Sequence, residues 1–143
     1  MRRARRLASM ALLALPAVGC KKSQECGALI GAANTTVAAA KKANPPQAPA
    51  LDLAQNQRSV AALYDALAGQ IAALGIQTDE LAPHARDYGR MSRDLAAAER
   101  KLADSADHRD KDELDVARAE FARLDEQELV LAGKVNGFCL GAP

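Results

Sequence analysis

Three polar side chains occupy positions where the spacing predicts buried residues, and they are the best candidates for binding a ligand. His84 and Tyr88 fall on a stripe of apolar residues with helical spacing, and Glu128 is the one charged residue of a second stripe. An imidazole, a phenol and a carboxylate that meet inside a helical protein could hydrogen-bond a small ligand or hold a metal ion. Met91 and Phe121 lie on the same stripes and would line such a pocket. A small-ligand or metal-binding bundle is therefore one of two functional hypotheses.

A metal or haem site has little further support in the sequence. His84 and His108 are the two histidines of the chain, and they are too far apart to share one helix face. The sequence has no Glu-x-x-His pair for a carboxylate-bridged di-iron site and no Cys-x-x-Cys-His motif for haem attachment. We therefore expect no metal and no cofactor.

Other reactive groups also have simpler interpretations. The densest acidic cluster, from Asp104 to Asp115, could attract a hard cation such as calcium. It lacks the glycine of an EF-hand loop and includes Arg109 and Lys111, so a solvated turn is the simpler interpretation. The five serines of the chain form no nucleophile elbow and have no histidine at a suitable spacing. We expect a protein that is not an enzyme.

The composition predicts a helical domain. The chain has 143 residues, no Trp, two Tyr and two Phe, and 49% of its residues are hydrophobic, with alanine strongly represented. Strands favour the β-branched and aromatic residues that are scarce here, so an all-β fold is disfavoured. The length suits one domain. A net charge of +1 without clustered basic residues gives no sign of a nucleic-acid partner.

Four segments repeat apolar residues at helical spacing, and residues that break helices separate them. In the second segment Leu53, Val60, Leu67 and Leu74 recur every seven residues, as in coiled coils, with Asn56 and Gln70 at alternate positions of the seam. The expected helices cover residues 25–43, 53–74, 81–102 and 111–138, with a proline-rich link at 44–49 and an acidic turn at 104–110.

Capping residues support these boundaries. Gly75 suits the end of the second helix and Thr78 the start of the third, where Pro83 is tolerated only in the first turn. Asp110 can cap the fourth helix, and Asn136 with Gly137 predicts its end.

These elements predict an all-α protein, most economically an up-down-up-down four-helix bundle in which each apolar stripe is buried against another. The alternative is an elongated helical hairpin, in which the heptad pattern continues across Gly75 as one long helix. Gly75 and Pro83 make that alternative less favourable.

The first nineteen residues have the features of a signal peptide. Four arginines lie among the first six residues, and an uncharged stretch of about 13 residues follows from Leu7 to Gly19. A membrane-spanning helix needs about 20 apolar residues, so a permanent transmembrane anchor is disfavoured.

The end of this leader resembles the lipobox of bacterial lipoproteins in the run Ala17, Val18, Gly19 and Cys20. The resemblance implies that signal peptidase II cuts before Cys20, which carries a diacylglycerol and usually a further acyl chain such as palmitate. Lys21, in the position where Asp favours the inner membrane, points by resemblance to the outer membrane. Ala17 replaces the usual Leu, and Ala17 with Gly19 also suits the ordinary signal peptidase, which would release a soluble periplasmic protein.

If Cys20 carries the lipid, Cys26 and Cys139 remain as an even pair in an oxidising compartment. A disulfide bond between them agrees with the bundle, in which the start of the first helix lies beside the end of the fourth. The alternative is that Cys26 is a small buried residue and Cys139 a tail residue.

The resulting division is a signal peptide at 1–19, a lipidated tether at 20–24 and a helical domain at 25–143. The favoured function is a membrane-anchored, non-catalytic helical module of the cell envelope, facing the periplasm or the cell surface, that binds another protein or organises the envelope. Leu129 and Val130 could belong to its interaction surface, although a wider buried stripe is the favoured interpretation of that pair.

Overall fold

The computed structural model describes residues 18–45 and 52–141. Within these ranges the regular structure is entirely helical: α1 (Val18–Ala43), α2 (Leu53–Ala73), α3 (Leu81–His108) and α4 (Lys111–Leu140). This confirms the all-α class. The predictions for the leader up to residue 17 and for most of the proline-rich link lie outside the described residues.

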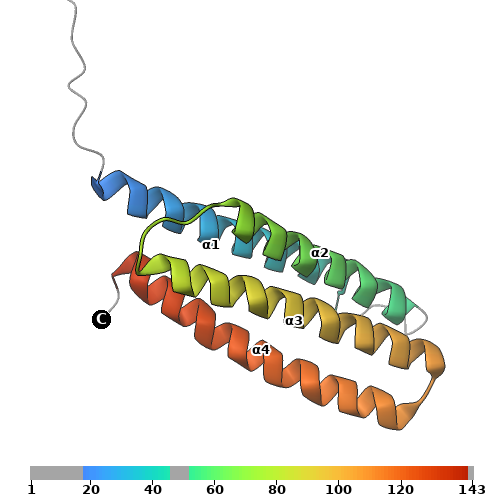
Figure 1. Cartoon of the computed structure of the whole chain (residues 1–143). Coiled ribbons are helices and arrows are strands. Elements are labelled where there is room, and N and C mark those ends of the chain that lie inside the picture. Colours follow the sequence, from blue (N-terminus) through green and yellow to red (C-terminus); the bar gives the residue numbers. More distant parts are fainter. Residues whose placement is uncertain (1–17, 46–51, 142–143) are drawn as a thin grey trace, which may run out of the picture.

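The four helices form an up-down-up-down bundle (Figure 1). Successive helices run in opposite directions, so the start of α1 lies at the same end as the end of α4. The elongated hairpin is wrong, because α2 ends at Ala73 and Gly75 adopts a left-handed φ of +57°. Glycine adopts that conformation without a steric penalty, which is why it ends helices so often.

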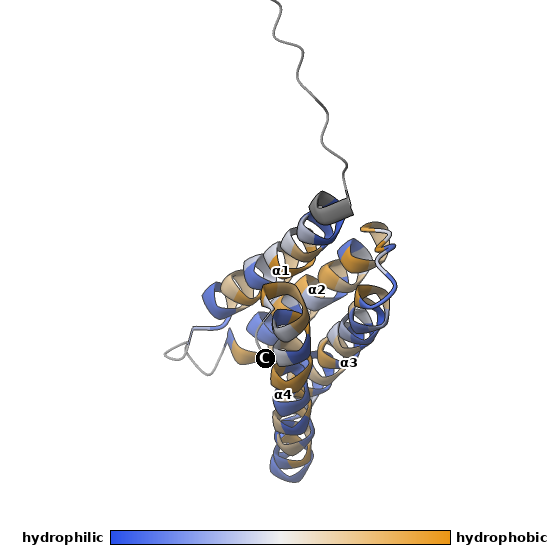
Figure 2. Ribbon diagram, turned by 90° about the vertical axis from the view of Figure 1, so that its left-hand side faces the viewer, coloured by the Kyte–Doolittle hydropathy of each residue, from blue (hydrophilic) through white to orange (hydrophobic). Residues whose placement is uncertain are grey.

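The core is built from the predicted stripes of all four helices. Each helix alternates hydrophobic and hydrophilic residues along its length (Figure 2), as expected when one face is buried. The largest apolar side chains that are completely buried are Leu29, Leu67, Leu81 and Leu95. Ala61, Ala96 and Ala103 are also buried, and such small side chains let helices approach closely. The pattern in α2 was only partly predicted, because Gln57, Tyr64 and Ile71 are buried whereas Gln70 is exposed.

The turn between α3 and α4 is shorter than predicted. α3 starts at Leu81, with Pro83 in its first turn, and it continues through the acidic segment to His108. Without Gly or Pro in that segment the helix has no local reason to stop, and it ends only where Arg109 adopts a left-handed φ of 56°. Asp110 then caps α4 as predicted, since its side chain accepts hydrogen bonds from the backbone N–H groups of Asp112 and Glu113 at 2.9 and 3.0 Å.

The outer ends of α1 and α4 also differ from expectation. α4 passes through Asn136 and Gly137 and ends at Leu140, where Gly141 adopts a φ of +66°. Packing of the last turn against α1 therefore overrides the local stop signal. α1 begins at Val18, so residues 20–24, expected to form a tether, are helical. None of the helices in the described part of the chain is long and apolar enough to span a membrane.

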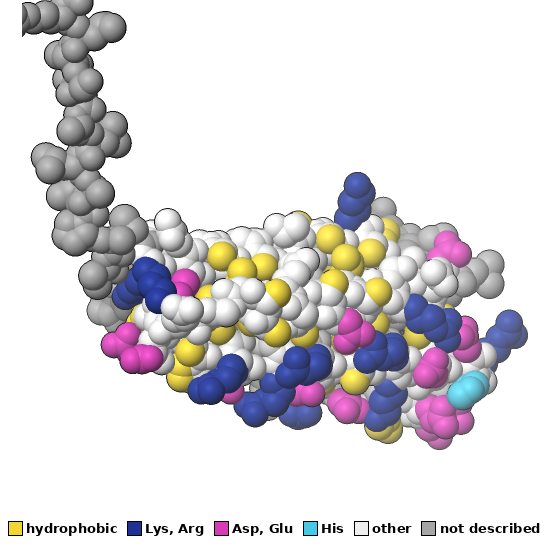
Figure 3. Space-filling model, turned by 45° about the horizontal axis from the view of Figure 1, so that its top comes forward, with side chains coloured by type: hydrophobic (Ala, Val, Ile, Leu, Met, Phe, Trp, Pro, Cys, Tyr) yellow, Lys and Arg dark blue, Asp and Glu magenta, His cyan; other side chains and the backbone are white. Residues whose placement is uncertain are grey.

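Ion pairs on the surface join neighbouring helices. Arg100 of α3 binds Asp65 of α2, and Lys101 of α3 binds Glu120 of α4. Charges of both signs are intermixed along the lower edge of the face seen in Figure 3. Exposed pairs of this kind contribute only about 0–1 kcal/mol each, so they add little to the stability of the bundle.

Candidate ligand-binding site

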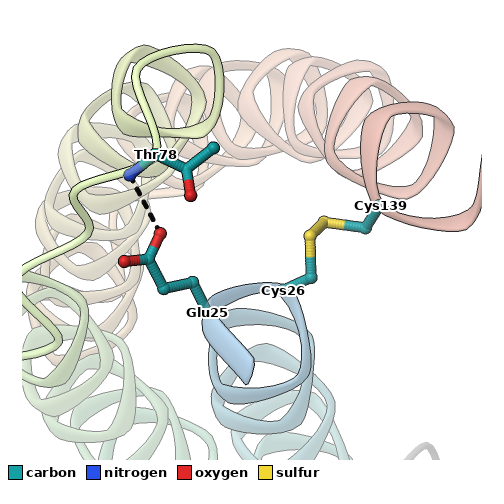
Figure 4. The surroundings of a disulfide bond; sticks show 4 residues. All are labelled: Glu25, Cys26, Thr78 and Cys139. Carbon is teal, nitrogen blue, oxygen red and sulfur yellow. Dashed lines mark hydrogen bonds between the residues drawn. A yellow bond between two sulfur atoms is a disulfide. The ribbon is translucent and has the colours of Figure 1, made fainter. Parts of the chain in front are cut away.

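One end of the bundle is held together covalently. Cys26 of α1 and Cys139 of α4 form a disulfide bond across 113 residues of sequence, with their Cα atoms 5.6 Å apart (Figure 4). The neighbouring Glu25 carboxylate accepts hydrogen bonds from the backbone N–H groups of Gln77 and Thr78 at 3.1 and 3.0 Å. Hydrogen bonding by Thr78 and Gln77 lowers the pKa of Glu25. The first turns of α1 are thus attached both to α4 and to the segment before α3.

Beyond this end, α1 and α4 pack against each other less than any other neighbouring pair of helices. A cavity with a volume of about 420 Å³ lies between them, and α2 and α3 close its inner side. That volume falls within the range of ligand pockets, about 300–1,000 Å³. Aliphatic side chains of α1 and α4 form much of its lining: Leu29, Ile30, Ala33, Val37, Ala132 and Val135.

The cavity gathers most of the aromatic side chains of the protein. Tyr64 of α2, Tyr88 of α3 and Phe121 of α4 line it, which are three of the four Tyr and Phe residues in the chain. Burial raises the pKa of both tyrosines, with the nearby Glu128 adding to the shift, so both phenols stay protonated and can donate hydrogen bonds.

A buried hydrogen bond crosses the inner side of the cavity. The Tyr88 hydroxyl donates to Glu128 Oε1 at 2.7 Å, and both residues are almost fully buried. Burial raises the pKa of Glu128 and the charge on Asp125 adds to this, while the Tyr88 hydrogen bond opposes it. Charge-assisted bonds of this kind are among the stronger hydrogen bonds in proteins.

A second buried carboxylate has an unused acceptor. Glu99 of α3 lines the cavity and is only 4% exposed, and its Oε2 has no hydrogen-bond partner among the described residues. Burial, together with the charge on Asp125, raises the pKa of Glu99 to about 7. A buried polar atom without a partner is costly in free energy, so Glu99 is the most distinctive group of the cavity.

Two of the three predicted pocket residues meet in the structure. Tyr88 and Glu128 are hydrogen-bonded in the cavity, whereas His84 lies near the disulfide end, its ring 6.3 Å from that of Phe138. Phe121 lines the cavity as expected, and Met91 is buried elsewhere. His84 is too near the start of α3 to reach a cavity that lies further along the bundle.

Sequence reasoning missed Tyr64 and Glu99. Glu99 lies four residues after Leu95, at a spacing that brings it onto the buried stripe of α3, although glutamate is seldom fully buried in proteins. Tyr64 lies four residues after Val60 on α2, between Val60 and Leu67 of the predicted heptad series. Helical spacing of four could have found both residues.

The remaining candidates on the surface do not form sites. Among the described residues no group of three or more His, Cys, Asp or Glu side chains is arranged to hold a metal ion. In the acidic segment Asp104 and Asp107 both bind Arg58 of α2, at 3.1 and 2.5 Å. Leu129 and Val130 are 68% and 60% exposed, so the expectation of a wider buried stripe was wrong. Leu129 is nevertheless among the residues that line the α1–α4 cavity, whereas Val130 is not.

No family model, curated protein or solved structure matches this chain. The cavity combines apolar walls, three aromatic rings and two buried carboxylates, one of which has an acceptor without a hydrogen-bond partner.

Proposed function

We propose that this protein is a non-catalytic binding protein that holds a small, largely apolar ligand in the cavity between α1 and α4. The observation that carries the proposal is the lining, which combines aliphatic and aromatic walls with a few polar groups at fixed positions. Ligand pockets in proteins have this composition, because apolar surface supplies affinity and a few polar groups orient the ligand.

The incomplete burial of α1 supports this proposal. Ile30, Ala33 and Val37 face the cavity and are only half-buried, although apolar residues of a bundle helix are ordinarily covered by its neighbours. A ligand that fills the cavity would remove this surface from water, at about 25 cal/mol for each Å².

The proposal includes attachment to the outer membrane of the cell envelope through lipid on Cys20. Cys20 precedes the disulfide-bonded Cys26 by six residues on the same helix. A lipid there would hold the protein by its rigid end and leave the cavity, which lies further along α1, away from the membrane surface.

A second candidate function is the interaction module that the sequence favoured, and the exposed Leu129 and Val130 support it. Photo-crosslinking in the membrane fraction from position 126, an exposed residue one helical turn before Val130, tests this candidate. A discrete adduct that is lost with Val130→Asp would support a protein partner at this face.

Binding of the neutral fluorescent probe N-phenyl-1-naphthylamine tests the cavity. The protein is the full chain carrying Cys20→Ser, which removes the proposed lipid. We expect Ala33→Phe to weaken binding because the ring fills the cavity, whereas Ala38→Phe places the same ring on an exposed position of the same helix. Equal binding by both variants would contradict the proposal.

The lipid anchor needs a separate test on the unaltered chain. The intact mass of protein from the membrane fraction should correspond to a chain that begins at Cys20 and carries a diacylglycerol and an acyl chain. An unmodified mass, or a chain that retains Met1, would disprove the anchor without affecting the cavity.

A further inference from the structure

We propose that the ligand of the α1–α4 cavity is an alkylammonium ion, a protonated amine on an apolar chain. This inference rests on the proposed function and specifies the chemistry of the same site. It follows from the charges, the free acceptor and the aromatic rings that surround the cavity.

The charges that line the cavity are mostly negative. Glu99, Glu128 and Asp125 contribute carboxylates, and Lys41, exposed on α1, is the one basic residue of the described lining. Carboxylates in a partly desolvated site attract a cation more strongly than they would in water. A fatty acid or another anion would be repelled from the same place.

The free acceptor of Glu99 calls for a donor from the ligand. Its Oε2 is buried and has no hydrogen-bond partner among the described residues, and Glu99 lines this cavity as well as a smaller pocket beside Gln57 and Arg118. Glu128, by comparison, already accepts a hydrogen bond from Tyr88. A protonated amine would give the Glu99 carboxylate both an N–H donor and a compensating positive charge.

The aromatic rings favour the same class of ligand. Tyr64, Tyr88 and Phe121 line the cavity beside the carboxylates. The faces of aromatic rings attract cations, and several rings around an acidic pocket are typical of sites that recognise organic ammonium groups. The aliphatic side chains of α1 and α4 leave an apolar surface for the hydrocarbon chain.

Calorimetric titration with three eight-carbon ligands tests the inference, using the full chain with Cys20→Ser at pH 8. Octylamine, 1-octanol and octanoate share the same apolar chain and differ only in the charge of the head group. We expect octylamine to bind about tenfold or more tightly than octanol, and octanoate to bind most weakly.

The matched variants are Glu99→Gln and Glu126→Gln. Glu99→Gln keeps the shape of the side chain but removes the charge, so octylamine should lose about tenfold in affinity while octanol is unaffected. Glu126 is an exposed residue of α4 outside the cavity lining, and its substitution should change neither affinity.

The pH dependence provides an independent readout. The groups around Glu99 are Asp125 and Glu128 on α4, Tyr64 on α2 and Lys41 on α1, with Arg118 of α4 on the neighbouring surface. In the control variant Glu126→Gln, which keeps Glu99, octylamine should bind less tightly at pH 5.5 than at pH 8, because Glu99 is protonated at the lower pH. In Glu99→Gln this dependence should be reduced.

The outcomes separate the inference from the proposed function. If the naphthylamine probe binds the cavity but octylamine has no advantage over octanol, the ligand class is wrong and the cavity function stands. The same conclusion follows if Glu99→Gln leaves octylamine affinity unchanged. If neither the probe nor any octyl ligand binds, both proposals fail.

Discussion

The hydroxyl of Tyr88 donates a 2.7 Å hydrogen bond to Glu128 Oε1 in the interior of the bundle, and this bond joins α3 to α4 across 40 residues of sequence. The partners lie on two stripes that were each recognised from their spacing. The bond links the two helices at the inner side of the cavity.

Removal of this hydroxyl should destabilise the protein. Tyr88→Phe leaves the buried Glu128 carboxylate without its partner, which should lower the free energy of unfolding by about 1–3 kcal/mol. Urea denaturation followed by circular dichroism measures the change. Tyr64→Phe is the matched control, because no hydrogen bond of the Tyr64 hydroxyl is found among the described residues. Equal losses in the two variants would show that the bond contributes nothing specific.

Glu99 should make stability depend on pH. Its pKa is about 7 in the folded protein against 4.5 for an ordinary glutamate, so the folded state holds the proton more tightly than the unfolded state. The resulting stabilisation is complete below pH 4.5 and is lost as the pH rises to 7. With about 1.4 kcal/mol for each pKa unit, the loss is on the order of 3 kcal/mol.

The effect of Glu99 is isolated by comparing unfolding free energies of the wild type and Glu99→Gln between pH 4 and pH 8. The unfolding free energy of the wild type should fall relative to that of Glu99→Gln as the pH rises, and the difference should become constant above pH 7. A difference that does not vary with pH would show that Glu99 is solvated and ionises normally.

Reduction of the disulfide should weaken the whole bundle. The bond between Cys26 and Cys139 closes a loop of 113 residues, and the chain-entropy model gives on the order of 5 kcal/mol for such a loop. Thermal unfolding with and without reductant measures the loss. The double variant Cys26→Ser, Cys139→Ser should melt at the same low temperature under both conditions. A wild type insensitive to reductant would contradict this prediction.

The Asp110 cap of α4 should also contribute measurably to the free energy of unfolding. Asp110→Ala removes the acceptor for the N–H groups of Asp112 and Glu113, at a cost of about 1 kcal/mol. Asp110→Asn keeps a good capping side chain and should restore most of the stability in the same denaturation experiment. Failure of Asn to restore stability would assign the effect to charge instead of capping.

The sequence by itself determined the helices and their order. Apolar spacing of three and four residues, Gly75, and the cap at Asp110 are local features that act whatever the rest of the chain does. Short connections between amphipathic helices then leave few arrangements, so the bundle and the proximity of Cys26 to Cys139 could be predicted before the fold was known.

Only the tertiary structure decided how closely the helices approach and which polar residues meet. Whether α1 packs tightly on α4 depends on how the two helices are placed relative to each other, which no local pattern specifies, and the cavity lies where they pack least. The same geometry buries Glu99, separates His84 from Tyr88 and Glu128, and carries α4 through Asn136 and Gly137. Packing between distant segments provides enough free energy to override a local stop signal or bury a carboxylate, and it exists only once the helices are assembled.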